Sequence, residues 1–177
     1  MFPQWSGQVR GLVLGLTLVV GACRTGAPVT LPGAAGLSVP RGLVGAVETA
    51  WPGAELGVST SAVCTGTSGA PTAGIAGDFN GDNMADLAFW IAREGRPHLV
   101  VGLARLEGEY DVVDAGVPVE GPVGQLELGR RGATYRGAGG VDEFFGMDTL
   151  IRRGCDGART VLTWTGAGFR AQVIDGK

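Results

Sequence analysis

Residues 78–86 carry oxygen-bearing groups at every second position of a short, turn-rich segment. Positions 1, 3, 5 and 9 have oxygen-bearing side chains and position 7 can offer its backbone carbonyl: Asp78, Asn80, Asp82 and Asp86, with Met84 at position 7. Calcium takes about six to eight hard oxygen ligands, and a tight loop that turns its odd positions inward supplies such a set. Crowded carboxylates repel one another, and a divalent cation relieves that cost. The spacing predicts a Ca²⁺ site that stabilises the fold.

This loop differs from an EF-hand in two places. Position 6 is Asn83, which after glycine best tolerates the left-handed conformation, and position 12 is Phe89 where an EF-hand has a bidentate glutamate. The pattern D-x-N-x-D-x-x-x-D-L followed by a strand resembles the calcium loop of FG-GAP and VCBS repeats. The resemblance implies a Ca²⁺ loop, but a single unit cannot build a propeller of several four-stranded blades. An Asx-rich turn that holds no ion remains the alternative.

The N-terminus has the pattern of an export signal. Arg10 precedes an unbroken apolar run over residues 11–20, which is too short to span a membrane because a spanning helix needs about 20 residues. Val20-Gly21-Ala22-Cys23 resembles the bacterial lipobox, which implies cleavage before Cys23 and attachment of lipid to it. We therefore expect a membrane-anchored lipoprotein of the cell envelope, at the outer membrane or cell surface. An ordinary signal peptide that happens to contain a cysteine is the alternative.

The cysteine count fits export. The chain has three cysteines, and an odd number in an exported protein requires explanation. If Cys23 carries lipid, Cys64 and Cys155 remain, and an oxidising compartment lets such a pair form a disulfide. Two inert buried thiols are the rival interpretation.

Catalytic motifs are sparse in this sequence. His98 is the sole histidine, and a nucleophile–base pair with Cys64 is conceivable but disfavoured by the predicted disulfide. The sequence has no G-x-S-x-G, phosphate-loop or H-E-x-x-H motif. Glu143 and Asp148 are the best candidates for acidic catalysis. We expect a non-catalytic module that binds a protein or a glycan; the alternative is a small exported hydrolase that uses acidic residues outside the loop.

Length and charge limit the organisation of the chain. A chain of 177 residues with a net charge of −3 allows one domain of ordinary size and shows no basic footprint for nucleic acid. We divide it into a signal peptide (1–22), a lipid-anchored tether of small residues and prolines (23–38) and one domain (39–177).

The rest of the chain predicts one helix and many short strands. A helix is predicted over residues 39–51, with Ser38 as its cap and an apolar face formed by Leu43, Val47, Ala50 and Trp51. Apolar runs bounded by turn residues predict the strands, with a hairpin turn over residues 94–97. The expected fold is α+β, with one N-terminal helix packed on a mainly antiparallel sheet and one Asp-rich loop. The predicted strands are 54–60, 85–92, 98–106, 110–117, 123–128, 147–153, 159–165 and 168–174.

Overall fold

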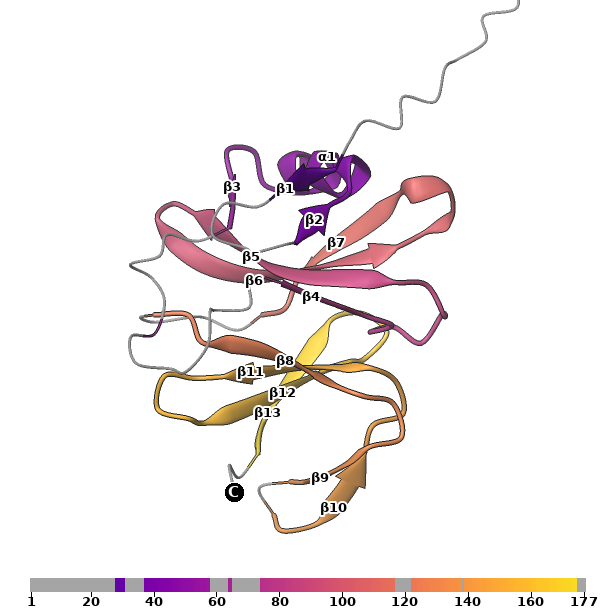
Figure 1. The fold of residues 1–177 in the computed structure, drawn as a ribbon, viewed down its shortest axis with the longest axis vertical. Coiled ribbons are helices and arrows are strands. Elements are labelled where there is room, and N and C mark those ends of the chain that lie inside the picture. Colours follow the sequence, from indigo (N-terminus) through magenta and orange to yellow (C-terminus); the bar gives the residue numbers. More distant parts are fainter. Residues whose placement is uncertain are drawn as a thin grey trace, which may run out of the picture.

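A computed structural model gives the architecture as layers of antiparallel sheet with one helix on the outside (Figure 1). It describes residues 28–30, 37–57, 64, 74–116, 122–137 and 139–174. The predicted signal peptide and Cys23 lie outside the described residues. No helix in the described part of the chain is long and apolar enough to cross a membrane.

The first sheet has five strands. Its order is β3-β5-β6-β7, and β4 pairs with β5 beside β3. All of these pairs are antiparallel. The strands are β3 (Glu55–Leu56), β4 (Gly74–Gly77), β5 (Asp86–Arg93), β6 (Arg96–Ala104) and β7 (Tyr110–Asp114).

The second sheet has four strands in the order β13-β12-β11-β8, again antiparallel. They are β8 (Gln125–Gly129), β11 (Thr149–Arg153), β12 (Arg159–Trp164) and β13 (Phe169–Ile174). A separate hairpin of β9 (Thr134–Arg136) and β10 (Asp142–Phe144) lies beyond this sheet, at the end of the molecule away from the helix (Figure 1).

The core lies between the two sheets. Strands alternate their side chains between two faces, so Trp90, Leu99 and Val101 of the first sheet meet Leu150 and Leu162 of the second in one buried cluster. All five are at most 1% exposed. The described residues thus form a mainly antiparallel β fold with one α-helix, which confirms the predicted class.

Helix α1 (Arg41–Ala50) covers the outer face of the five-stranded sheet. Leu43 and Val47, one turn apart, are buried in a cluster with Phe89, Ile91 and Val100. The predicted apolar face is correct except at Ala50, which is exposed. Trp51, directly after the helix, packs partly against the cluster as predicted.

The predicted start of the helix needs correction. Ser38 does not cap it, because Ser38 lies in β2 (Ser38–Val39) and the N-cap is Pro40, whose carbonyl accepts a hydrogen bond from the Val44 N–H at 3.1 Å. Strand β2 pairs with β1 (Val29–Thr30). Residues 29–30 of the predicted tether therefore pair with the strand that leads into the helix, and Val39 of that strand is buried in the cluster under the helix.

The strand predictions agree with the structure in their positions, with ends displaced by a few residues where the structure describes them; residues 58–60 and 117 of the predicted strands lie outside the described residues. The hairpin turn predicted over 94–97 is tighter than expected, since Glu94 and Gly95 have φ values of 52° and 74° and Arg96 already pairs with Arg93. Two central residues with positive φ match the twist of the flanking strands, so two residues suffice. The sequence does not predict five of the described strands: β1, β2, β4, β9 and β10.

The predicted disulfide is present. Cys64, which lies between β3 and β4, is bonded to Cys155 in the turn between β11 and β12. The bond closes a loop with a sequence separation of 91 and joins segments of the two sheets. It also removes Cys64 as a candidate thiol nucleophile.

Candidate functional site

The acidic segment joins β4 to β5 at one end of the first sheet. Gly77 pairs with Asp86 in the antiparallel ladder, so the residues between them must reverse direction within a short loop. Gly81 and Asn83 make this reversal with φ values of 80° and 65°. The expectation that Asn83 accommodates the left-handed conformation at position 6 is confirmed.

Asp86 is the buried member of the loop, with 1% of its surface exposed. Its Oδ2 accepts a hydrogen bond from the Phe79 N–H and its Oδ1 accepts one from the Ala104 N–H, both at 2.8 Å. Burial raises the pKa of this carboxyl, the two N–H donors oppose the rise, and the charge of Asp82 adds to it. Asp86 therefore ties the loop to the end of β6 and carries a desolvation cost.

Three side chains nearer the tip fold inward onto the loop backbone. Asp78 accepts hydrogen bonds from the Gly81 N–H at 2.8 Å and the Asn83 N–H at 3.2 Å. Asn80 Oδ1 accepts a hydrogen bond from the Asp82 N–H at 3.0 Å, and Asp82 Oδ1 accepts one from the Met84 N–H at 2.8 Å. The contacts of Asn80 and Asp82 are Asx-turn contacts, and together with those of Asp78 they shape the loop without needing any ion.

The arrangement of these carboxylates differs from a closed metal cage. In the described part of the chain, no three His, Cys, Asp or Glu side chains form a group that could hold a metal ion. The Asn80 Nδ2 donates to Asp82 Oδ2 at 2.8 Å, so an N–H donor faces the carboxylate here. Each carboxylate oxygen that accepts one N–H keeps a further lone pair. Met84 belongs to the same loop, and its N–H donates to Asp82.

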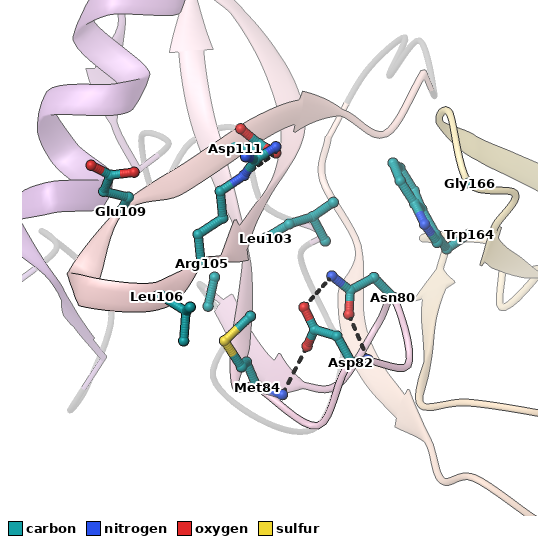
Figure 2. Close-up of a pocket in the computed structure, with 11 residues that line it drawn as sticks. Asn80, Asp82, Met84, Leu103, Arg105, Leu106, Glu109, Asp111, Trp164 and Gly166 are labelled. Carbon is teal, nitrogen blue, oxygen red and sulfur yellow. Dashed lines mark hydrogen bonds and ion pairs between the residues drawn. The ribbon is translucent and has the colours of Figure 1, made fainter.

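A groove of about 620 Å³ opens beside the loop. Asn80, Asp82 and Met84 form one side of it (Figure 2). Arg105, directly after β6, and Trp164, the last residue of β12, approach from the two different sheets. The groove therefore lies where the loop and both sheets meet.

The groove walls have fixed polar and aromatic groups. Arg105 Nε donates to Asp111 Oδ2 at 2.6 Å, which orients the guanidinium. The Trp164 ring packs against Phe169 with ring centres 5.2 Å apart. Sequence reasoning did not find Arg105 or Trp164 because they are 59 positions apart in the chain and belong to no local motif. Only the folded arrangement of the two sheets brings them to one groove.

The residues considered for catalysis have other contacts. His98 Nδ1 lies 3.2 Å from Asp114 Oδ2, on neighbouring strands β6 and β7. The Glu143 carboxylate accepts hydrogen bonds from the Tyr135 hydroxyl and the Gln172 amide, and these bonds lower its pKa. A general acid at neutral pH needs the opposite shift.

The second acidic candidate also serves the backbone. Asp148 accepts hydrogen bonds from the Asp78 N–H at 3.3 Å and from the Arg131 N–H at 3.0 Å. It thereby connects the acidic loop to the second sheet. Nothing in these contacts singles out a catalytic pair.

Comparison with known proteins does not add a family. No family model, curated protein or solved structure matches this chain.

Proposed function

We propose that this chain is a non-catalytic, calcium-stabilised lipoprotein of the cell envelope that binds a glycan in the groove beside its acidic loop. The observation that carries the proposal is a shared position: Asn80 and Asp82 belong both to the predicted Ca²⁺ loop and to the groove that Trp164 borders. An ion bound by the loop would therefore fix one side of the binding groove.

The case for calcium rests on charge and burial. Asp78, Asp82 and Asp86 fall within nine residues, and burial raises the pKa of the last of them. A bound cation would offset the cost of keeping that carboxylate charged. The ligand set would be Asp78, Asn80, Asp82, Asp86 and the backbone carbonyl of Met84. The Asn80 Nδ2 now faces Asp82 Oδ2, so binding requires this amide to turn away.

The case for a glycan rests on the groove. Sugars present apolar C–H faces, which stack on indole rings, and hydroxyl groups, which pair with carboxylates, amides and guanidinium groups. Trp164 supplies the ring, while Asn80, Asp82 and Arg105 supply polar groups. An open, solvent-exposed groove with few convergent polar groups suits a chain-like ligand. A protein segment is the other partner that the sequence analysis allowed.

The case for an envelope location rests on two independent features. The lipobox-like segment ending at Cys23 implies export and a lipid anchor, and the Cys64–Cys155 disulfide fits an oxidising compartment. Mass spectrometry of the membrane-extracted protein is expected to find a diacylglyceryl group on Cys23. Recovery of unmodified mature protein from the soluble fraction would contradict the anchor.

The calcium proposal is tested by thermal unfolding in calcium and in chelator. At calcium concentrations about 100 times the dissociation constant, binding adds about 2.7 kcal/mol, which raises the melting temperature of a domain of this size by about 5–10 °C. Asp82→Ala is expected to abolish the rise. Asp156→Ala is the matched control, because Asp156 also caps a turn, by accepting from the Ala158 N–H, but lies outside the loop. Superimposable melts with calcium and chelator would contradict the site.

The glycan proposal is tested by titrating a panel of soluble oligosaccharides while following amide chemical shifts. A binder should shift signals of the loop and of β12, and Trp164→Ala should weaken it at least about tenfold, because an aromatic stacking partner and its buried area are lost. Trp51→Ala is the control, since Trp51 packs near helix α1 and does not line the groove. Equal affinity in both variants, or shifts confined to other surfaces, would contradict the proposal.

A further inference from the structure

The acidic loop contains an asparagine directly before a glycine, a pair in which the side-chain amide can react with the main chain. Asn80 precedes Gly81, and the chain has one other asparagine, Asn83, which precedes Met84. In an asparagine–glycine pair the backbone nitrogen of the glycine can attack the side-chain amide carbon, because glycine has no side chain to obstruct the approach. Whether the reaction occurs in a folded protein depends on how the turn holds the two reacting groups.

The turn keeps the Asn80 side chain beside the Gly81 nitrogen. Asn80 Oδ1 accepts a hydrogen bond from the Asp82 N–H at 3.0 Å (Figure 2), and the ring that this bond closes contains both the Asn80 Cγ and the Gly81 nitrogen. Asn80 Nδ2 donates to Asp82 Oδ2 at 2.8 Å, so the oxygen and the nitrogen of the amide are both held. Groups held in one orientation react at a lower entropic cost.

The neighbouring polar groups assist an attack on this amide. The Asp82 N–H contacts the oxygen on which negative charge develops when the amide carbon becomes tetrahedral, and a fixed backbone donor stabilises such an oxyanion. Asp78 Oδ1 accepts a hydrogen bond from the Gly81 N–H at 2.8 Å. A charged acceptor draws this proton away from the nitrogen and makes the nitrogen a better nucleophile.

The surroundings of Gly81 leave room for the reaction. Gly81 is exposed and has a φ value of 80°. A Cβ built on it would have only atoms of the Met147 side chain within 4 Å, the nearest at 3.8 Å. Water, which completes the reaction, therefore has access to this part of the loop.

We propose that Asn80–Gly81 is a site of spontaneous deamidation, at which the loop acquires a further carboxylate. The Gly81 nitrogen gives its proton to a base in the solvent and bonds to the Asn80 Cγ, while the Cγ–Nδ2 bond breaks and the nitrogen takes up a proton and leaves as ammonia. Water then opens the five-membered imide at one of its two carbonyl carbons. One product has aspartate at position 80, and the other has isoaspartate, in which the main chain runs through the Cβ.

Both products change the charge of the loop. The reaction removes the Nδ2 donor that faces Asp82 Oδ2 and leaves a negative charge close to Asp78 and Asp82. Isoaspartate also lengthens the main chain by one carbon within the turn. The aspartate product presents only oxygen atoms to the loop and should hold a cation more tightly than the native asparagine does; this consequence, unlike the deamidation itself, rests on the proposed calcium site.

Another turn of the chain provides a matched comparison. Asp156 Oδ1 accepts a hydrogen bond from the Ala158 N–H at 3.0 Å, and Gly157 has a φ value of 84°, so this exposed turn shares the Asx contact and the glycine conformation of the turn at Asn80. The Gly157 N–H, however, donates to the Gly154 carbonyl at 3.0 Å and not to a carboxylate. Asp156→Asn therefore creates a second asparagine–glycine pair without the assisting acid.

Mass spectrometry of peptides compares the two pairs within one molecule. The chain carrying Cys23→Ser, which cannot receive lipid, and Asp156→Asn is incubated at mildly alkaline pH with chelator, so that the loop stays free of ions. The mass gain from amide to carboxylate should appear at Asn80 at least about fivefold faster than at position 156, because a charged acceptor assists there. Asn83 should keep its mass, because the Met84 side chain obstructs the attack.

Removal of the assisting acid tests the arrangement itself. Asp78→Asn should slow the conversion at Asn80 at least about fivefold. Asp142→Asn is the control for the loss of one negative charge, since Asp142 is exposed on the β9–β10 hairpin, and it should leave the rate unchanged. Unchanged melting temperatures would show that both variants fold. The proposal is overturned if Asn80 keeps its mass, if position 156 converts as fast as Asn80, or if a folded Asp78→Asn chain converts at the native rate.

Discussion

The outer faces of the two sheets are covered in different ways. On the five-stranded sheet, helix α1 contributes Leu43 and Val47 to a continuous buried cluster. On the four-stranded sheet, the β9–β10 hairpin covers a smaller cluster around Ile151 and Val161 and leaves a cavity of about 850 Å³ with three arginines. The first cover completes the core, while the second leaves a cavity between itself and the sheet.

The difference follows from the covering elements. A helix of ten residues presents side chains one turn apart as an unbroken apolar stripe. The strands of the hairpin have three residues each, and their burial alternates, so that Tyr135 faces inward while its neighbours are exposed. Two short strands cannot close the face of a sheet four strands wide.

The largest expected effect on stability comes from removing the Cys64–Cys155 disulfide, which joins segments of the two sheets. Replacing Cys64 and Cys155 together by serine should lower the free energy of unfolding by about 4 kcal/mol, because the loop of 91 residues regains its freedom in the unfolded state. Chemical denaturation measures the change. A reductant should destabilise the native chain and leave the double variant unaffected. A loss below about 1 kcal/mol would mean that the sheets associate without needing the cross-link.

Truncating a buried side chain of helix α1 should lower the free energy of unfolding more than truncating one under the β9–β10 hairpin. Leu43→Ala should lower the free energy of unfolding by about 2–5 kcal/mol, because it leaves a cavity in a fully buried cluster. Phe145→Ala should cost less globally, because the hairpin can open locally, and it should speed amide hydrogen exchange in β9 and β10. Leu106→Ala, at an 80% exposed position, is the control. Equal global costs for the first two variants would contradict the distinction.

The smallest expected effect is a pH dependence confined to the hairpin. Partial burial and the hydrogen bond to Glu143 raise the pKa of Tyr135 to about 12, and the same bond lowers the pKa of Glu143. The phenol therefore stabilises the fold fully below its unfolded pKa of 10.0, and this contribution is lost as the pH rises to about 12. The carboxylate's contribution is present above its unfolded pKa of 4.5 and is lost as the pH falls.

Phenolate absorbance and hydrogen exchange measure these two losses. The late absorbance step should disappear in Tyr135→Phe, and Glu143→Gln should move it toward 10.0. Exchange of the hairpin amides should quicken at both ends of the pH range in the native chain. A hairpin with the same exchange protection in Glu143→Gln at every pH would show that this bond does not hold the cover.

Much of the fold could be predicted because its signals are local. The apolar face containing Leu43 and Val47 predicts the helix, and apolar runs bounded by turn residues predict β5 and β6. The odd cysteine count predicts the disulfide. The hairpin strands β9 and β10 escaped prediction because they are short, polar and rich in neighbouring glycine, so they show no alternation long enough to detect.

The sites were less predictable than the elements. Spacing identified the acidic loop, but not that Asp78 and Asp82 accept backbone N–H groups within it. Trp164 and Arg105 reach the groove, and Arg130 and Arg159 reach the cavity, through the pairing and stacking of sheets. Contacts between segments far apart in the chain leave no periodic trace in a single sequence.

The two hydrogen bonds of Asp86 have a mechanical consequence. One oxygen holds the Phe79 N–H at the start of the loop and the other holds the Ala104 N–H, directly before Arg105. A single carboxylate thus connects the acidic loop to the side of the groove that carries Arg105. A shift of the acidic loop is therefore transmitted to the end of β6, and the loop and the strand together determine the width of the groove. Protonation of Asp86 would weaken both hydrogen bonds and loosen the two sides of the groove at once.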